Sequence, residues 1–416
     1  MRKAFVLPSL IVLAACSGGG DSREQSDTAT EAAPAHQGAD SMASRDPAPG
    51  ERAAEDIADA QQRPVMQLQV VLERLGFGPG VIDGSMGMST ENALSGFQEA
   101  NGLQVTGEYD DATRQALSRW TNIPATRVVT IPEDWGQLTF AAMPEGPAEQ
   151  AKMDHLGYES MDEKLAERFH TTIEVLHQLN PGGKPATATA ANTAAAGAGG
   201  SATAGSALAT GGQATAQGNA DAAARGDAAA ADQAAAPMFR AGQQIRVPNV
   251  GADRINPADV EDATWRETLV SLGVGSEQPK AARIVVDKSG GWLKAYDSAD
   301  KLIAMFTVTT GSQHDPLPLG EWGIKGVAHN PPFAYNPDLF WDASNSESKQ
   351  QLPPGPNGPV GVVWIDLTKE HYGIHGTGAP ETIGRAQSHG CVRLTNWDAA
   401  RLAQMVDGST KVLFQA

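Results

Sequence analysis

Two long stretches that lack large apolar side chains limit where this chain can fold. Residues 17–62 are mostly Ala, Ser, Asp, Glu, Gln and Pro, and residues 184–237 are mostly Ala, Gly, Thr and Ser. Such segments bury too little apolar surface to offset the entropy that is lost on ordering, and the scattered Gly and Thr interrupt the helix that alanine favours. We therefore predict a disordered linker at 17–62, a disordered insert at 184–237, and compact structure only outside them.

The first 16 residues have the pattern of an export signal. A basic start precedes an apolar run from Ala4 to Leu13, which is too short to span a bilayer but suits the core of a signal peptide. The sequence LAAC, ending at Cys16, resembles the bacterial lipobox, which implies that residues 1–16 are a lipoprotein signal and that Cys16 is lipidated. Because Ser17 and not Asp follows, the resemblance implies an outer-membrane anchor facing the periplasm. The alternative is an ordinary signal peptide in which Cys16 is incidental.

Charge and cysteine content narrow the choice of partners. The formal net charge is −18 and the sequence pI is about 4.9, which argues against a nucleic-acid partner, because phosphate binding needs a basic face. The chain has two cysteines, Cys16 and Cys391. If Cys16 carries lipid, Cys391 has no partner for an internal disulfide. Cys391 then either forms an intermolecular disulfide or is a free and reactive thiol.

A short internal repeat organises residues 63–122. After an amphipathic helix that starts at Pro64, the segments DGSMGMSTENAL and TGEYDDATRQAL carry Gly, Thr and Ala-Leu at equal offsets. Each copy predicts a glycine turn, a polar helix start and an amphipathic helix, so we expect a small all-α three-helix bundle. The pattern resembles the peptidoglycan-binding domain of cell-wall enzymes, which implies peptidoglycan binding. The alternative is a helical spacer without a ligand.

A second unit is expected at residues 155–250. The segment YESMDEKLAERFHTTIEVLHQLN predicts two short helices, and QIRV at 244–247 predicts a strand. Together they resemble an α+β LysM glycan-binding module with the insert 184–237 between its helices and its strand. A loop that long inside a compact unit counts against the assignment. We expect the histidines of this region, His170 among them, to be surface or packing residues.

The chain changes to a strand pattern over residues 280–416. Apolar and polar side chains alternate from Ile284 to Val308, with turns at Gly290-Gly291 and Asp300. Further strands are expected near 320–327 and 360–366, and one helix at 396–405. We predict a mostly β domain, whose sheet can hold short site-bearing loops rigidly.

Cys391 lies in a stretch whose residue types suit nucleophilic catalysis. The thiolate is the reactive form of cysteine, and a neighbouring imidazole can take the thiol proton. His389 lies two residues before Cys391, on the same side of an extended segment, so the residues alone favour His389 over His375 as the base. Gly390 leaves room for a substrate carbonyl, and the amides of Gly390 and Cys391 can stabilise an oxyanion.

Three other interpretations of Cys391 remain open. Free cysteines are often buried core residues. His375, His389 and Cys391 have the ligand types of a zinc site, although no fourth ligand stands out and the spacing matches no zinc signature. A redox thiol is the third, without a CxxC motif to support it. We predict no metal and no cofactor.

The sequence IHGTGAPETIGRAQSHGCVRL also resembles the active-site motif of L,D-transpeptidases with a YkuD-type catalytic domain. The resemblance spans residues 280–416 and implies a β-sandwich-like fold with Cys391 in a cleft. It implies that Cys391 attacks a tetrapeptide stem of peptidoglycan, that the terminal D-alanine leaves, and that a thioester acyl-enzyme remains. The amine of a second stem then attacks the thioester, which gives a 3→3 cross-link.

The same resemblance implies a role for each residue of the motif. His375 matches the proton acceptor and donor, a role that proximity gave to His389, and we follow the family here. Gly376 matches the position whose carbonyl orients that imidazole. Arg393 matches a position that supports the site or holds a substrate carboxylate, and a structural salt bridge is its alternative. The positions around the oxyanion hole are matched by Ser388, His389 and Gly390.

Together these features predict an exported, lipid-anchored cell-wall enzyme of several domains. Its partners would be peptidoglycan and, through the N-terminal lipid, the membrane. Two alternatives are kept. If water or a lipoprotein lysine is the acceptor, the chain is a hydrolase or an enzyme that attaches or detaches lipoproteins. If it has no activity, it is a tether between membrane and wall.

Overall fold

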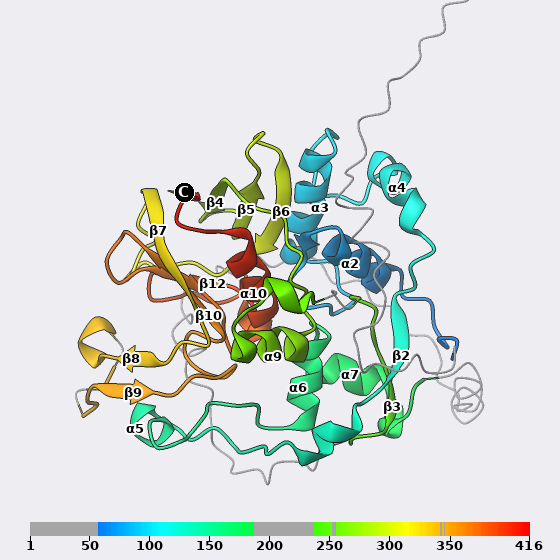
Figure 1. The fold of residues 1–416 in the computed structure, drawn as a ribbon. Helices are drawn as coiled ribbons and strands as arrows, with labels where there is room; N and C mark the ends of the chain where they lie inside the picture. The colour runs from blue at the N-terminus through cyan, green and yellow to red at the C-terminus, as the bar shows by residue number, and fades with distance from the viewer. Residues whose placement is uncertain (1–56, 187–236, 252–254, 342, 345) are drawn as a thin grey trace, which may run out of the picture. The chain divides into compact units, whose positions relative to one another are not determined.

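The computed structural model describes residues 57–186, 237–251, 255–341, 343–344 and 346–416 (Figure 1). The predicted signal peptide with Cys16, most of the linker 17–62 and nearly all of the insert 184–237 lie outside the described residues. In the part of the chain that is described, no helix is long and apolar enough to cross a membrane.

The first part of the described chain is helical, as the repeat predicts. Its helices are α2 (Pro64–Arg74), α3 (Met88–Ala100) and α4 (Asp111–Leu117), followed by a 3-10 turn at Ser118–Trp120. Helix α2 begins at a proline, whose missing N–H costs nothing at that position, and Asp110 caps α4 by accepting from the Thr113 amide. The repeat did not predict the short strand β1 (Phe77–Gly78), which pairs in parallel with β6 (Leu302–Thr307) of the C-terminal sheet.

A second unit contains the two helices and the strand expected between 155 and 250. These are α6 (Met161–Arg168), α7 (Ile173–Leu179) and β3 (Gln244–Pro248). Strand β3 pairs antiparallel with β2 (Thr126–Thr130), which the sequence did not predict. The apolar faces meet in one cluster, which includes Leu165, Leu176 and Ile245. The two helices therefore lie between two paired strands in chain order.

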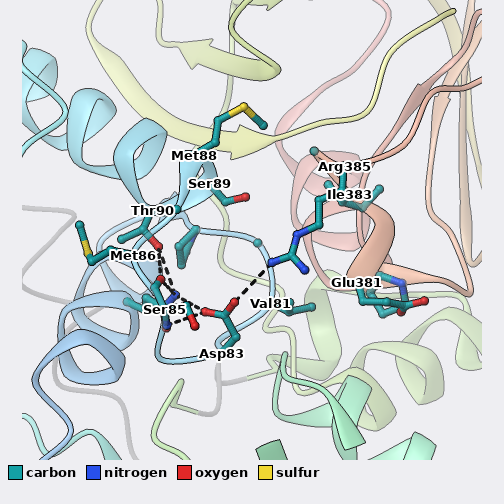
Figure 2. Close-up of a pocket in the computed structure, with 16 residues that line it drawn as sticks. Val81, Asp83, Ser85, Met86, Met88, Ser89, Thr90, Glu381, Ile383 and Arg385 are labelled. Carbon is teal, nitrogen blue, oxygen red and sulfur yellow. Dashed lines mark hydrogen bonds and ion pairs between the residues drawn. The ribbon is translucent and has the colours of Figure 1, made fainter. Parts of the chain in front are cut away.

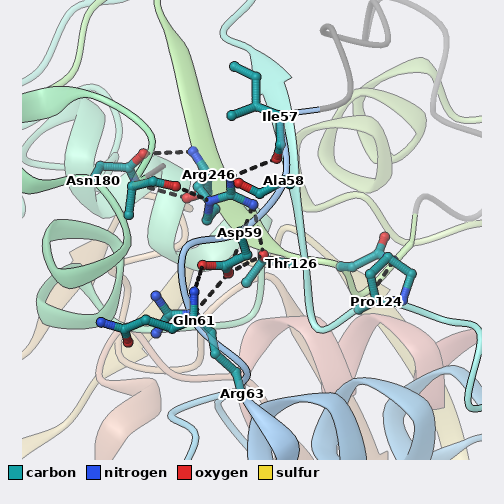
Figure 3. A network of polar contacts seen from close by, with 11 residues as sticks. Ile57, Ala58, Asp59, Gln61, Arg63, Pro124, Thr126, Asn180 and Arg246 are labelled. Atoms are coloured by element: carbon teal, nitrogen blue, oxygen red, sulfur yellow. Dashed lines mark hydrogen bonds and ion pairs between the residues drawn. The ribbon is translucent and has the colours of Figure 1, made fainter. Parts of the chain in front are cut away.

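Arg246 ties the start of the described chain to this unit (Figure 3). Its side chain is almost fully buried. The guanidinium donates to the carbonyls of Ile57 and Ala58 at 2.8 and 3.1 Å and to the Thr126 hydroxyl at 3.0 Å. The side chain of Asn180, which follows α7, accepts a hydrogen bond from the Arg246 amide at 2.6 Å and donates one to the Arg246 carbonyl at 2.7 Å. Because a buried guanidinium needs its donors satisfied, these contacts fix where β3 meets the segment before α2.

Shorter elements connect the units. They are the 3-10 turns Glu133–Gln137, Pro181–Gly183 and Pro257–Asp259, with α5 (Pro147–Gln150) and α9 (Ala263–Leu272). Asp262 caps the start of α9, because its carboxylate accepts from two amides of the first turn, and Gly273, with φ +78°, follows its end. No structure was predicted from the sequence for residues 255–280, which contain this capped helix.

The C-terminal part is β-rich, as predicted. Nine of the described strands form one sheet in the order β1-β6-β5-β4-β13-β7-β10-β11-β12. Strand β7 pairs with β13 through residues 320–323 and with β10 through residues 324–329, so it is shared by the two halves of the sheet. The bounds not yet given are β4 (Arg283–Asp287), β5 (Trp292–Tyr296), β7 (Gly320–His329), β10 (Val363–Leu367), β11 (Gly373–His375), β12 (Val392–Arg393) and β13 (Lys411–Gln415).

Two further elements border this sheet. Strands β8 (Phe333–Tyr335) and β9 (Gln350–Leu352) form a separate antiparallel pair, and the 3-10 turn Pro337–Leu339 lies in the segment between them. Helix α10 (Asn396–Met405), the one helix that the sequence predicted here, is buried along almost its whole length. It contacts β10 and β11, which places its first residues beside the segment with the thiol motif.

A buried charge network joins helix α2, the residue after α6 and helix α10. His170, after α6, lies 3.3 Å from Glu73 of α2 through Nδ1 and 3.8 Å from Asp398 of α10 through Nε2. Arg401 holds the other Glu73 oxygen at 2.6 Å, and the His170 ring stacks on Trp397 with centroids 5.3 Å apart. His170, expected as a surface or packing residue, is thus the centre of an ion network.

Candidate active site

Strand register brings His375 and the thiol motif together. Strands β11 and β12 pair in parallel, with His375 opposite Arg393. Cys391 directly precedes β12, so it lies at the start of the strand that pairs with β11. On the other side of β11, Trp364 of β10 lies opposite His375, and their rings stack at 5.5 Å.

The imidazole of His375 is held in one orientation. The side chain is 4% exposed, and Nδ1 donates to the Gly376 carbonyl at 2.7 Å. A neutral imidazole that donates from Nδ1 leaves Nε2 as an acceptor. Burial lowers the pKa of His375 to about 3, and the positive charge of Arg393 acts in the same direction. His375 is therefore neutral at physiological pH and able to accept a proton at Nε2.

Cys391 is a free, partly buried thiol. Its sulfur lies 3.8 Å from the His371 carbonyl oxygen, to which the thiol donates. Burial raises the pKa of Cys391, while a backbone hydrogen bond from Gly373 and the charge of Arg393 partly oppose this rise. Both pKa shifts favour neutral forms, so at rest Cys391 is a thiol and His375 is a neutral imidazole.

The backbone before Cys391 is fixed by Ser388 and Gly390. The Ser388 hydroxyl donates to the Cys391 carbonyl at 2.5 Å, and its amide donates to Thr310 at 3.0 Å. Gly390 has φ +99°, and a Cβ there would lie 2.6 Å from the ring of Tyr372. Only glycine fits this turn, because both the backbone angle and the space exclude a side chain.

His389 faces different neighbours from His375. Its ring meets Phe340 edge-on at 5.2 Å and Trp341 at 6.2 Å, both from the segment between β8 and β9. Trp341 is half exposed and also stacks on His314 at 4.5 Å. The aromatic side chains around His389 thus lie beside the thiol motif, where they can contact a substrate.

Asn396 packs directly against the backbone of Gly376. A Cβ on Gly376 would lie 2.2 Å from Asn396 Oδ1, and that oxygen accepts from the Val362 amide at 3.1 Å. The Asn396 amide donates to Glu167 at 2.7 Å and to the Pro356 carbonyl at 3.0 Å. The sequence patterns did not indicate a role for Asn396 or Tyr372. The signal for them was the pair Gly376 and Gly390, because Asn396 and Tyr372 occupy the space that a side chain at these two positions would need.

Arg393 acts on the site through its charge. Its backbone exchanges hydrogen bonds of 2.8 and 3.0 Å with Thr309, which anchors β12 to the segment after β6. Its guanidinium lies close enough to lower the pKa of both His375 and Cys391. A cation there favours negative charge on sulfur or on a substrate oxygen.

One group of described residues has the donor set of a metal site. The ligand atoms of Glu73, His170 and Asp398 lie within 4.8 Å of one another. The two nitrogens of His170 point to different carboxylates, and Arg401 supplies a cation. This geometry suits an imidazolium between two carboxylates better than a metal ion, which would need one nitrogen aimed at a common centre.

Two family models match the chain. Residues 281–413 match YkuD, described as the "L,D-transpeptidase catalytic domain", and residues 61–117 match the "Putative peptidoglycan binding domain". Among curated proteins, the "Putative L,D-transpeptidase YkuD" of Bacillus licheniformis is 31% identical over 146 residues, which cover 35% of this chain and 73% of that protein. The "Probable L,D-transpeptidase YbiS" of Escherichia coli K12 is 43% identical over 63 residues, 15% of this chain and 20% of that protein.

Solved structures give a weaker likeness. L,D-transpeptidase 3 from Mycobacterium tuberculosis is 15% identical, with a TM-score of 0.27, over 32% of this chain and 60% of that chain. The catalytic domain of the Enterococcus faecium L,D-transpeptidase is 20% identical, with a TM-score of 0.25, over 32% of this chain and 95% of that chain.

Proposed function

The chain belongs to the family of L,D-transpeptidases with a YkuD catalytic domain, and from this premise we propose that Cys391 is its nucleophile and His375 its proton acceptor. It is an enzyme of peptidoglycan that carries a peptidoglycan-binding domain and acts outside the cytoplasm. The observation that carries the proposal is the parallel pairing of β11 with β12. This pairing supports the proposal because it brings the strand that ends at His375 next to the strand that follows Cys391.

The first half-reaction forms a thioester. As the sulfur of Cys391 attacks the carbonyl carbon of the stem peptide bond, Nε2 of His375 takes the thiol proton. The C–N bond then breaks, and His375 returns the proton to the departing amine of D-alanine. The hydrogen bond from Nδ1 to Gly376 supports this role, because it orients the ring and stabilises the imidazolium that forms.

The surrounding residues stabilise charge and hold the turn. The amides of Gly390 and Cys391 are the proposed donors to the oxyanion of the tetrahedral intermediate. Ser388 holds the Cys391 carbonyl and so fixes the direction of these amides. Arg393 adds positive charge, and His389, with its two aromatic neighbours, is proposed to line the approach of the substrate.

The second half-reaction transfers the acyl group. The amine of another stem attacks the thioester carbon, the C–S bond breaks, and the proton lost by the amine passes through His375 to the sulfur. A 3→3 cross-link is the proposed product. Water, or the lysine of an outer-membrane protein, would instead give a tripeptide or a protein conjugate.

The finer assignments of the other regions are also proposals. Residues 155–250 are proposed as a LysM-like module, supported by the two helices and strand β3, which pairs with β2 from before the proposed start. Residues 63–122 and 280–416 are the proposed bounds of the peptidoglycan-binding and catalytic domains, the latter β-sandwich-like because β7 serves both halves of its sheet. A lipid on Cys16 would anchor the enzyme in the outer membrane, facing the periplasm.

The test is intact-mass spectrometry of the protein mixed with a soluble tetrapeptide stem. We expect an adduct that equals the stem minus one D-alanine, and no adduct in Cys391→Ala. Product analysis then distinguishes cross-linked dimers, tripeptides and conjugates. An adduct that persists in Cys391→Ala, or its absence from the unaltered protein, would refute the assignment of the nucleophile.

A further inference from the structure

A cavity separate from Cys391 lies where the peptidoglycan-binding domain meets the loop between the two halves of the thiol motif (Figure 2). Its volume is about 160 Å³, and its walls come from residues 79–90 and from residues 380–385. Cys391, His375 and Arg393 do not line it. Drug-sized ligands usually occupy roughly 300–1,000 Å³, so this cavity has room for one or two residues of a peptide.

One wall of the cavity is built around a fixed carboxylate. Oδ1 of Asp83 accepts from the Gln69 side chain at 2.8 Å and from the Ser85 amide at 2.9 Å. Gln69 is 1% exposed, and its side-chain oxygen accepts from the Gly84 amide at 2.7 Å. The turn before α3 is therefore held by a buried amide, and it directs Oδ2 of Asp83 towards the opposite wall.

The opposite wall carries an exposed cation. Nη2 of Arg385 lies 3.5 Å from Oδ2 of Asp83, and the Arg385 side chain is 68% exposed. A contact this long to an exposed arginine is weak, so Arg385 can also bind an anionic group of a ligand. Glu381 lines the same wall. The cavity therefore offers both signs of charge within a few ångströms.

The lining indicates a peptide rather than a sugar. Sugar rings are commonly held by stacking on aromatic side chains, whereas the apolar lining here is aliphatic and includes Met86 and Met88. Carboxylates beside a guanidinium match a zwitterionic ligand, with an ammonium group near Asp83 and a carboxylate near Arg385. Peptide stems of the wall carry both groups, and a bare glycan strand carries no ammonium.

Hydrogen bonds through Thr309 connect the cavity wall to the strand that follows Cys391. The Gly384 amide donates to the Thr309 hydroxyl at 2.9 Å, and Thr309 exchanges backbone hydrogen bonds with Arg393. On its other side, a Cβ at Gly384 would lie 3.3 Å from the Met88 methyl group. A ligand in the cavity would thus contact a loop that is joined to β12 by two hydrogen-bonded steps through Thr309.

We propose that this cavity is a second binding subsite for the peptide part of peptidoglycan, which takes a zwitterionic stem segment between Asp83 and Arg385. The proposal rests on the proposed function, because it names the polymer that the enzyme cross-links as the ligand. It gives the loop 380–385 a role in holding one stem while another reacts at Cys391.

The test uses the full chain with Cys391→Ala and ¹³C-labelled methionine methyl groups. Met86 and Met88 line the cavity and are 47% and 44% exposed, so their methyl resonances report on it directly. Each resonance is assigned by a Met→Leu variant. We expect both to shift and saturate when a soluble tetrapeptide stem is titrated, and to stay unchanged with a peptide-free glycan oligomer.

Charge variants then test the contacts. Arg385→Ala should weaken binding at these methyl groups about three- to tenfold, a modest loss because the arginine is exposed. The control is Arg114→Ala, an exposed arginine of the same domain that is paired with Asp111 outside the cavity. Unmoved Met86 and Met88 resonances, an equal shift with glycan alone, or an unchanged affinity in Arg385→Ala would each overturn the proposal. If the mass adduct at Cys391 still forms, the proposed function survives that failure.

Discussion

The protonation state of Cys391 can be tested by the pH dependence of its alkylation. Burial raises the pKa of Cys391 above that of an ordinary cysteine. The thiolate fraction at pH 7 is then below the value of about 3% that a cysteine with a pKa of roughly 8.5 would have. Because only the thiolate reacts, the alkylation rate with iodoacetamide should rise about tenfold per pH unit between pH 6 and pH 8.

A thiolate–imidazolium pair would behave differently. It would exist between the two pKa values of the pair and give a rate plateau across neutral pH. Burial lowers the pKa of His375 to about 3, so no such plateau is expected. Normalising each rate to its value at high pH removes the effect of access to the partly buried sulfur. Glutathione measured in parallel, and Cys391→Ala for reaction at Cys16, are the controls.

His375→Gln separates ionisation from proton transfer. The variant should keep the steep alkylation profile of Cys391, because the neutral imidazole contributes no charge. Acylation by a tetrapeptide stem should fall by about 10²–10⁴-fold, the usual contribution of a general base. An alkylation rate of the unaltered protein that is constant from pH 5 to pH 8 would refute the neutral pair, as would full acylation in His375→Gln.

Two more predictions concern stability and the turn. The pKa of buried His170 is raised by the carboxylates that face it, so its contribution to stability is complete below about pH 6.5 and is lost as pH rises through its folded pKa. His170→Gln should therefore cost about 3 kcal/mol of unfolding free energy at pH 6, and this gap should narrow by pH 9 in chemical denaturation. If the difference in unfolding free energy between the two proteins did not change with pH, His170 would not be charged in the folded protein. Gly390→Ala should cost about 1–3 kcal/mol, because it forces a Cβ against Tyr372 at φ +99°, and should abolish stem acylation by displacing the turn. Gly326→Ala, where a Cβ meets nothing within 4 Å, should stay acylated, and equal activity of the two variants would argue against the turn as a fixed element.

Local sequence patterns were enough to predict the helices of the first domain and the L,D-transpeptidase family of the C-terminal part. Helix α2 follows from a proline start and apolar residues at helical spacing, and α4 follows from the Asp110 cap. The motif around Cys391 could be recognised because a cysteine, a histidine and glycines stand at short spacing. Such features are encoded within a few residues of one another, where backbone propensity and side-chain alternation act.

Contacts between distant segments decided the rest. Sequence spacing favoured His389 as the base. The pairing of β11 with β12 puts His375 opposite Arg393, whereas the His389 ring lies against Phe340 and Trp341. The same holds for β1 beside β6 and for His170 between carboxylates of two other segments. No local pattern encodes these pairings, because strand register and burial depend on which segments meet after the chain has collapsed. The residue types therefore set the possible chemistry, and the packing of remote segments determined the surroundings and the orientation of each imidazole.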